Sequence, residues 1–263
     1  MNARAVAACF EDIAPISTGI ASDLAAGNLG FRFGNPDVEV AGVGVCWWMS
    51  EEVLEAAARM GLNMIISHEP ELWRWYESPF HTNLQPQTLE FNLRKIRTLI
   101  DHGMAVYTAH TNWDNQLDVG MGPSLARALG FTDLIRRDVS VGVYGVEPTT
   151  FSALVERVKR AMNLDMVRVQ GDPDRRVETV VLGWGSMGSE VEAVLANRAD
   201  AGIFGELREW PFLFAREAGV GLIETTHLAS ESIGAQMLVE ELRKRMPNLR
   251  IEFLDVPMPF RYE

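Results

Sequence analysis

Short apolar runs rich in β-branched residues alternate along the chain with longer segments in which apolar residues recur every three or four positions. The first pattern predicts buried strands, and the second predicts amphipathic helices. Strands are expected within residues 38–47, 64–67, 104–109, 141–146, 166–170, 177–183, 201–205, 221–226 and 250–256. Because such alternation is typical of βαβ units, we predict an α/β fold with largely parallel or mixed sheets.

Residues 50–60 carry the signals of both ends of a helix. Ser50 is a natural N-cap just before the apolar stripe that starts at Val53, and Gly61 is a natural stop. Further helices are expected within 87–103 and 230–246.

Two series of elements repeat the same order along the chain. In each series a strand and a helix lead to a second strand that ends in polar residues, and a helix and a glycine then lead to a third strand followed by a histidine. The residues at these strand ends are His68, Glu69, His110, Glu206 and His227. The repetition predicts two similar α/β lobes, residues 1–135 and 136–263, packed intimately enough to form one structural unit.

Side chains at the carboxyl ends of parallel strands meet at one edge of a sheet, which is where sites form in α/β proteins. Asp114 lies four residues after His110 and Glu231 four residues after His227, and on a helix such pairs share a face. Imidazole and carboxylate ligands without thiolates suit Zn, Fe, Mn, Co or Ni. The donors exceed one tetrahedral set, which indicates two metal ions.

Taken singly, each of these histidines is also typical of a helix cap or a packing residue. Their recurrence at equivalent points of two series is what favours a metal site.

A second motif, G-x-G-x-x-G, is formed by Gly183, Gly185 and Gly188 between a predicted strand and a predicted helix. This is the context of a dinucleotide-binding turn. The acidic residue that should end a second strand is missing, except for Glu206, which belongs to the other set. We therefore favour a tight turn whose N–H groups hold an anion, with a nicotinamide-dependent oxidoreductase as the alternative.

The composition narrows the class of partner. A formal net charge of -12 and a pI near 4.9 argue against a nucleic-acid partner. Two cysteines do not make a disulfide framework, and no apolar run reaches the length of a membrane span. We expect a soluble, cytoplasmic protein that acts away from membranes.

Aromatic residues cluster just after Glu69. We expect them to pack down a loop or a subunit interface, and the alternative is one wall of a substrate pocket. They are Trp73, Trp75, Tyr76 and Phe80.

The segments "GLNMIISHEP", "YTAHTNWDNQLDVGMGPSLARALG", "VVLGWGSMGSEV" and "THLASESIGAQMLVEEL" resemble, in that order, landmark segments of the Nif-three-like family. Its members are also called type 2 GTP cyclohydrolase I or dinuclear-metal-centre hexameric proteins. The resemblance implies a two-lobed α/β fold, a toroidal homohexamer and two divalent metal ions per chain. The ligands that it implies are His68, Glu69, Asp114, His227 and Glu231, with His110 beside them.

The chain departs from the family at one of these ligands. Where the family has two adjacent histidines before a proline, this chain has His68-Glu69. A carboxylate still ligates metals, so the resemblance implies either a harder ligand set or a site for a single ion.

These residues favour a metal-dependent hydrolase acting on a small phosphorylated or nucleotide-like substrate, in line with the GTP cyclohydrolase label. Glu206 or His110 would carry protons in such an enzyme. The alternative is a non-enzymatic metal-binding protein that serves as a toroidal scaffold, a carrier or a regulator.

Overall fold

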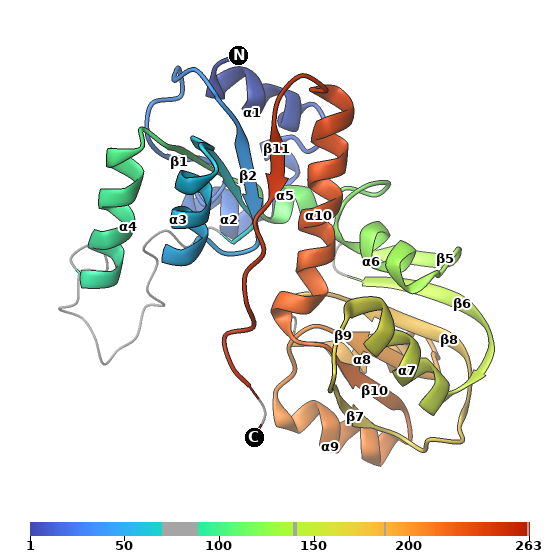
Figure 1. The fold of residues 1–263 in the computed structure, drawn as a ribbon. Coiled ribbons are helices and arrows are strands. Elements are labelled where there is room, and N and C mark those ends of the chain that lie inside the picture. Colours follow the sequence, from blue (N-terminus) through green and yellow to red (C-terminus); the bar gives the residue numbers. More distant parts are fainter. Residues whose placement is uncertain (70–88, 139–140, 187, 262) are drawn as a thin grey trace. The chain divides into compact units, whose positions relative to one another are not determined.

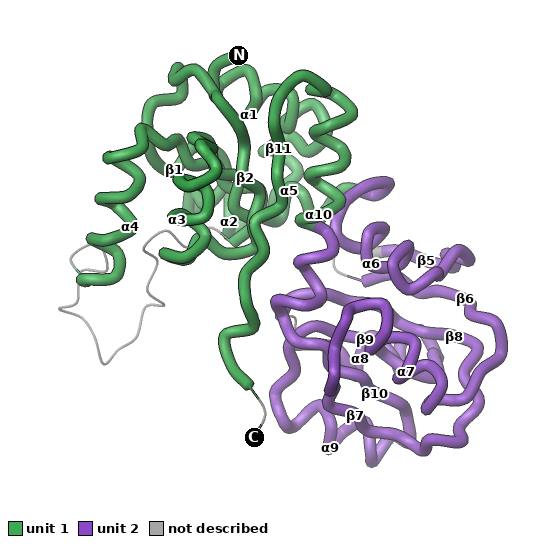
Figure 2. The backbone as a smooth tube through the Cα atoms, viewed as in Figure 1, with its two compact units in different colours: residues 1–116, 235–263 green, residues 117–234 purple. Residues whose placement is uncertain are grey.

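Two β-sheets, one of five strands and one of six, organise the computed structural model of the protein (Figure 1). The structure describes residues 1–69, 89–138, 141–186, 188–261 and 263. Residues 1–116 and 235–263 form unit 1, and residues 117–234 form unit 2 (Figure 2).

The division differs from the expected boundary at residues 135 and 136, which falls within strand β5 (Asp133–Asp138) of unit 2. The C-terminal segment belongs to unit 1 because its strand β11 (Ile251–Phe253) pairs with β2 (Val43–Cys46).

The sheet of unit 1 is parallel except at one edge. Its strand order is β1 (Gly30–Phe33), β4 (Ala105–Thr108), β3 (Met64–Ser67), β2 and β11. Only β1 runs antiparallel, against β4. Every residue of β2, β3 and β4 is buried, as expected of parallel strands that are covered on both faces.

The helices of unit 1 are α1 (Ala3–Glu11), α2 (Ala21–Ala26), α3 (Glu51–Arg59), α4 (Glu90–Asp101) and α5 (Thr111–Asp114), with a 3₁₀ turn at Ile16–Thr18. Helix α3 begins and ends as its sequence predicts. The Val53 N–H donates to Ser50 Oγ at 3.2 Å, and Gly61 follows the helix with a φ of 69°. The buried Val53 and Leu54 then pack α3 into the core beside β2 and β3.

Unit 2 contains a mixed sheet. Its strand order is β5, β6 (Val141–Thr150), β8 (Arg176–Gly183), β9 (Ala201–Phe204), β10 (Gly221–Glu224) and β7 (Arg168–Gln170). Strands β8, β9 and β10 are parallel, and the remaining neighbours are antiparallel. The helices are α6 (Met121–Leu129), α7 (Phe151–Met162), α8 (Glu190–Ala196) and α9 (Glu209–Ala218).

Helix α10 (His227–Arg245) begins in unit 2 and ends in unit 1. None of the described helices is long and apolar enough to cross a membrane.

The predicted α/β class with parallel and mixed sheets is confirmed, and each expected strand range contains a strand. Strands β1 and β5 are not predicted by the pattern. Strand β5 lies at an edge of its sheet, where Asp133 and Arg136 are exposed and the apolar signal is weak.

The core of unit 1 gives a direct test of this packing. Ile65 of β3 is fully buried, whereas Ile100 of α4 is 63% exposed. We expect Ile65→Ala to lower the free energy of unfolding by about 2–5 kcal/mol, because it removes buried methyl groups and leaves a cavity. Ile100→Ala should change it by less than about 0.5 kcal/mol. Urea unfolding compares the two variants, and equal midpoints would contradict the packing described for β3.

Candidate metal centre

The ends of β3 and β4 bring two histidines together in unit 1. The strands are parallel, with Ser67 paired to Thr108, so the chain leaves both strands at the same edge. His68 follows β3 directly, and His110 lies two residues beyond β4. Their ring centroids are 5.1 Å apart, with the planes at 61°.

His68 is buried, with 3% of its surface exposed. Its Nδ1 lies 2.9 Å from the carbonyl oxygen of Ala109. A carbonyl only accepts hydrogen bonds, so Nδ1 carries the proton. The other ring nitrogen, Nε2, then carries the lone pair. That Nε2 lies 3.7 Å from Oδ1 of Asp114, which is also buried, at the end of α5.

His110 is held through its Nδ1 by Asp23, a residue of α2, at 2.7 Å from Oδ2. Asp23 also accepts hydrogen bonds from Thr111 Oγ1 and from Asn28 Nδ2. Burial disfavours the Asp23 carboxylate, but the hydrogen bonds from His110, Asn28 and Thr111 outweigh it and hold the pKa of Asp23 well below its usual value. Asp23 is therefore an ionised acceptor at neutral pH.

The pKa of His110 is shifted in the opposite direction to that of Asp23. Burial alone would lower the pKa of His110, but the hydrogen bond to Asp23, together with the nearby carboxylates of Asp114 and Glu69, outweighs it and raises the pKa above its ordinary value. With Nδ1 bonded to Asp23, the Nε2 atom of His110 lies 4.0 Å from Oε1 of Glu69.

Glu69 sits in a turn fixed by the backbone. Its N–H donates to the carbonyl of Trp47, and its own carbonyl accepts from Ser67 Oγ at 2.8 Å. His68, Glu69 and His110 each offer one ligand atom, and these three atoms all lie within 4.8 Å of one another. Unit 1 thus gathers two imidazoles and a carboxylate at one sheet edge.

Unit 2 repeats the arrangement with β9 and β10, which are parallel with Phe204 paired to Glu224. Helix α10 begins at His227, so Glu231 lies one turn further on the same face, as predicted. His227 lies between two carboxylates, with Nδ1 3.2 Å from Glu206 Oε2 and Nε2 3.0 Å from Glu231 Oε2. Glu231 is buried, whereas the Glu206 side chain is 57% exposed.

The turn at Gly185 packs against this pair. Gly185 has a φ of 62°, and a Cβ there would lie 2.4 Å from Glu231 Oε1. Its N–H donates to Ser230 Oγ at 3.0 Å, and its carbonyl accepts from the Glu206 N–H at 2.7 Å. Only glycine allows so close an approach, so the turn supports the first residues of α10.

The glycine motif was expected to hold an anion with its N–H groups. The Gly185 N–H is bonded to Ser230, and the Gly188 N–H donates to Glu190 Oε1 at 2.6 Å. Both groups are used within the chain, so these two positions do not form the expected anion cradle.

One pattern is shared by His68, His110 and His227. In each ring Nδ1 lies at hydrogen-bond distance from an oxygen of the same unit, and Nε2 faces a carboxylate oxygen. This is how metal-binding histidines are usually held, because the bond at Nδ1 leaves the Nε2 lone pair for the ion.

The spacings fit a metal ion. With ligand bonds of about 2.1 Å, two ligands of one ion lie about 3–3.5 Å apart. His227 Nε2 and Glu231 Oε2 already stand 3.0 Å apart. The unit 1 separations of 3.7 and 4.0 Å exceed that range by less than an ångström, which small side-chain rotations close. The nitrogen and oxygen donors of both units therefore suit a divalent transition metal.

Sequence reasoning missed Asp23, which anchors His110 from 87 residues away. No local pattern marks this carboxylate as different from other acids at helix starts. The aromatic cluster expected to pack a loop or line a pocket lies outside the described residues.

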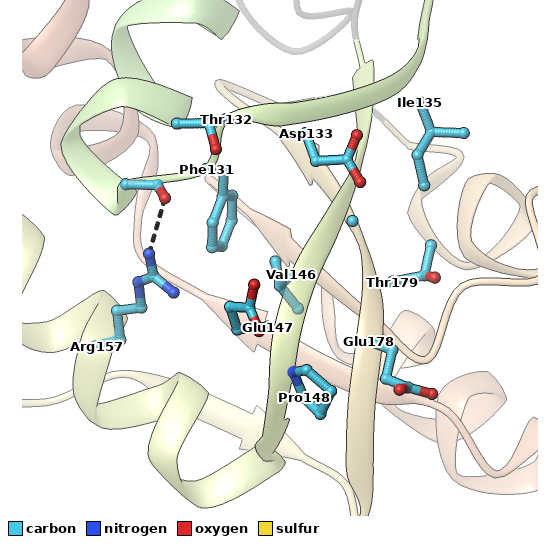
Figure 3. A pocket seen from close by; sticks show the side chains of 12 residues that line it. Phe131, Thr132, Asp133, Ile135, Val146, Glu147, Pro148, Arg157, Glu178 and Thr179 are labelled. Carbon is cyan, nitrogen blue, oxygen red and sulfur yellow. Dashed lines mark hydrogen bonds between the residues drawn. The ribbon is translucent and has the colours of Figure 1, made fainter.

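A separate pocket of about 410 Å³ lies in unit 2, lined by parts of β5, β6 and β8 and by Arg157 of α7 (Figure 3). Arg157 donates to the carbonyl of Gly130, while Asp133, Glu147 and Glu178 give the walls carboxylates. None of the candidate ligands lines this pocket, so the pocket is not part of the candidate metal centre.

The chain is similar to curated proteins that carry the name GTP cyclohydrolase 1 type 2 homolog. The homologue from Clostridium perfringens is 25% identical over 257 residues, covering 93% of this chain and 92% of that protein. The homologue from Streptomyces coelicolor is 29% identical over 241 residues, covering 85% and 82%.

Solved structures share the fold. The Bacillus cereus protein related to NIF3 superposes with a TM-score of 0.84 at 15% identity, covering all of this chain and 99% of the other. The model of the Duf34/NIF3 (NGG1p interacting factor 3) family matches residues 1–259. The resemblance read from the strand-end motifs is thereby confirmed, and the chain belongs to the Duf34/NIF3 family.

Proposed function

We propose that the protein is a metal-dependent hydrolase whose divalent ions are bound by the donor sets of the two units. The observation that carries the proposal is the shared arrangement of His68, His110 and His227, each anchored at Nδ1 with Nε2 facing a carboxylate. The names of the relatives support a small phosphorylated or nucleotide-like substrate, since they refer to GTP.

The proposed ligands are His68, Glu69 and Asp114 in unit 1, and His227 and Glu231 in unit 2. A bound divalent ion would supply a Lewis acid that lowers the pKa of water and polarises the bond under attack. That all five residues share one dinuclear centre stays a prediction, as does the toroidal homohexamer.

Of the two predicted proton carriers, Glu206 is the better placed to exchange protons with solvent. More than half of its side chain is exposed, and one oxygen accepts from His227 Nδ1. It can therefore take up a proton from the reaction and pass it to water while also orienting the ligand histidine.

The first test is metal content. Untagged protein purified without chelator should contain about one or two transition-metal ions per chain by elemental analysis. Glu231→Ala should lower that content, because it removes the buried carboxylate beside His227. Glu240→Ala, an exposed glutamate on the same helix, is the matched control and should retain the metal. A wild-type protein that binds no metal even after loading with zinc would refute the proposal.

Turnover separates the hydrolase from a non-enzymatic metal-binding protein. Metal-loaded protein should release product from a panel of phosphoesters and nucleotides, and Asp114→Asn should slow release by at least about 100-fold. Full metal loading without turnover on any substrate of the panel would instead support a scaffold, carrier or regulator.

The Gly185 turn provides a further prediction. Gly185→Ala places a methyl group against Glu231 and should weaken zinc binding, whereas Gly219→Ala has nearly the same φ, 68°, with open space around it. Both variants should lose about 1–2 kcal/mol of stability from backbone strain. Only Gly185→Ala should lose zinc affinity, measured by calorimetry. Equal affinities would show that the turn does not support the ligand pair.

A further inference from the structure

We infer that Trp47 binds a planar ring of the substrate beside the metal donors, and that Trp48 and Lys95 are positioning residues that hold Trp47 in place. The substrate then carries an aromatic ring as well as the bond under attack, as a nucleotide does. The inference rests on the proposed function, because it names a specificity-determining surface of the same site. This surface lies at the end of β2, which supplies none of the candidate ligands.

The backbone places Trp47 next to the donors of unit 1. Strand β2 runs parallel to β3, so the chain leaves both strands at the same edge of the sheet. Just beyond that edge, the carbonyl of Trp47 accepts from the Glu69 N–H at 2.9 Å, and the carbonyl of Trp48 accepts from the Ser50 N–H at 3.0 Å. The two tryptophans are therefore fixed between a candidate ligand and the N-cap of α3.

Both tryptophans of this pair are partly exposed. By contrast, Trp113 of the same unit is fully buried. A tryptophan ring has a large apolar face, and leaving part of it in water forgoes the stabilisation that its burial would give. An aromatic face that stays accessible beside convergent polar groups is typical of a ligand-binding surface.

The side chains of the pair are supported by a buried cation from α4. The Nζ atom of Lys95 lies 5.6 Å from the centroid of the Trp48 ring and 5.9 Å from that of Phe91. Lys95 is only 6% exposed, so its charge lies on the protein side of the Trp48 ring. A cation held over an aromatic face attracts the ring and restricts its orientation. Trp48 in turn contacts Trp47, with 6.2 Å between the ring centroids.

The spacing within the pair decides how a ligand ring binds. A ring inserted between two others needs parallel planes about 7 Å apart, which is twice the contact distance of about 3.5 Å. The planes of Trp47 and Trp48 are tilted by 37° and their centroids are only 6.2 Å apart, so no ring fits between them. The substrate ring therefore packs on the outside of the pair. Because Lys95 occupies one face of Trp48, Trp47 is the residue that contacts the substrate.

The alternative role of the pair is packing between α3 and α4, which the contact of Lys95 with Trp48 would also stabilise. A residue that only packs would be enclosed, as Trp113 is. The partial exposure of Trp47 and its backbone bond to Glu69 favour substrate recognition.

The experiment compares two phosphorylated ligands, one with an aromatic ring and one without. Full-length protein is titrated with GMP and with ribose 5-phosphate by calorimetry, first loaded with zinc and then after treatment with EDTA, which prevents metal-dependent hydrolysis of either ligand. Trp47→Leu should weaken GMP binding by about 5- to 150-fold, because the stacking of a base on the indole ring is lost. The affinity for ribose 5-phosphate should stay the same. Trp210→Leu, which changes a partly exposed tryptophan of α9, is the matched control and should leave both affinities unchanged.

Variants of Lys95 test the positioning role. Lys95→Met removes the charge from a side chain of similar length and should weaken GMP binding by about 2- to 30-fold. Lys95→Arg should restore most of the affinity, because a guanidinium also attracts a tryptophan face. Failure of arginine to restore it would exclude a positioning role for the charge. Thermal unfolding checks each variant, and Trp47→Phe, which keeps an aromatic ring and should retain most of the affinity, tests the position if Trp47→Leu does not fold.

The outcomes separate this inference from the proposed function. A wild type that binds GMP no more tightly than ribose 5-phosphate, or unchanged GMP affinity in Trp47→Leu, would exclude Trp47 as a ring-binding residue. Unchanged GMP affinity together with an altered oligomeric state, measured by light scattering, would assign this surface to a second copy of the chain. In each case the proposed metal dependence still stands, because zinc content and turnover of ring-free phosphoesters are measured separately. Loss of GMP affinity in Trp47→Leu, in a protein that hydrolyses no substrate, would reject the hydrolase and keep the ring-binding surface.

Discussion

The register between parallel strands decides where the candidate ligands lie. Ser67 pairs with Thr108 in unit 1, and Phe204 pairs with Glu224 in unit 2, so the residues just beyond each pair leave the sheet at the same level. A slip of one residue would turn alternate side chains to the opposite face and separate the imidazoles from the carboxylates. The buried apolar residues of these strands hold the register, which links the packing of the core to the chemistry at its edge.

Buried polar groups at these edges are stable only because they are bonded. Asp23, His68 and Glu231 are each at least nine-tenths buried, and burial of an unpaired charge costs several kcal/mol. Asp23 offsets that cost with three hydrogen bonds, and His68 uses a backbone carbonyl. The same bonds fix ring orientation, so the contacts that make burial tolerable also prepare the Nε2 atoms for a cation.

The candidate ligands at the strand ends could be proposed from sequence because their signals are local. A strand that ends in His68-Glu69, and a histidine four residues before a glutamate at a helix start, are patterns of a few positions. Asp23 was not predictable in this way, since its link to His110 spans 87 residues and depends on how α2 packs.

The expected boundary between the lobes also depended on contacts between residues far apart in the sequence. It was placed from the order of elements along the chain, but β11 pairs in space with β2 and draws the C-terminal segment into unit 1. Strand β5 was missed because edge strands tolerate charges. The periodicity of apolar residues reveals that a segment forms a strand, but it does not reveal which distant strand it pairs with.

The pairing of β11 with β2 has a consequence for synthesis on the ribosome. Unit 2 is one continuous stretch and can complete its sheet as soon as it emerges. Unit 1 cannot complete its sheet so early, because about two hundred residues must be translated after β2 before its partner β11 is synthesised. During that interval an apolar strand edge is open to pairing with other nascent chains. The five-stranded sheet of unit 1 is therefore complete only after β11 has been synthesised.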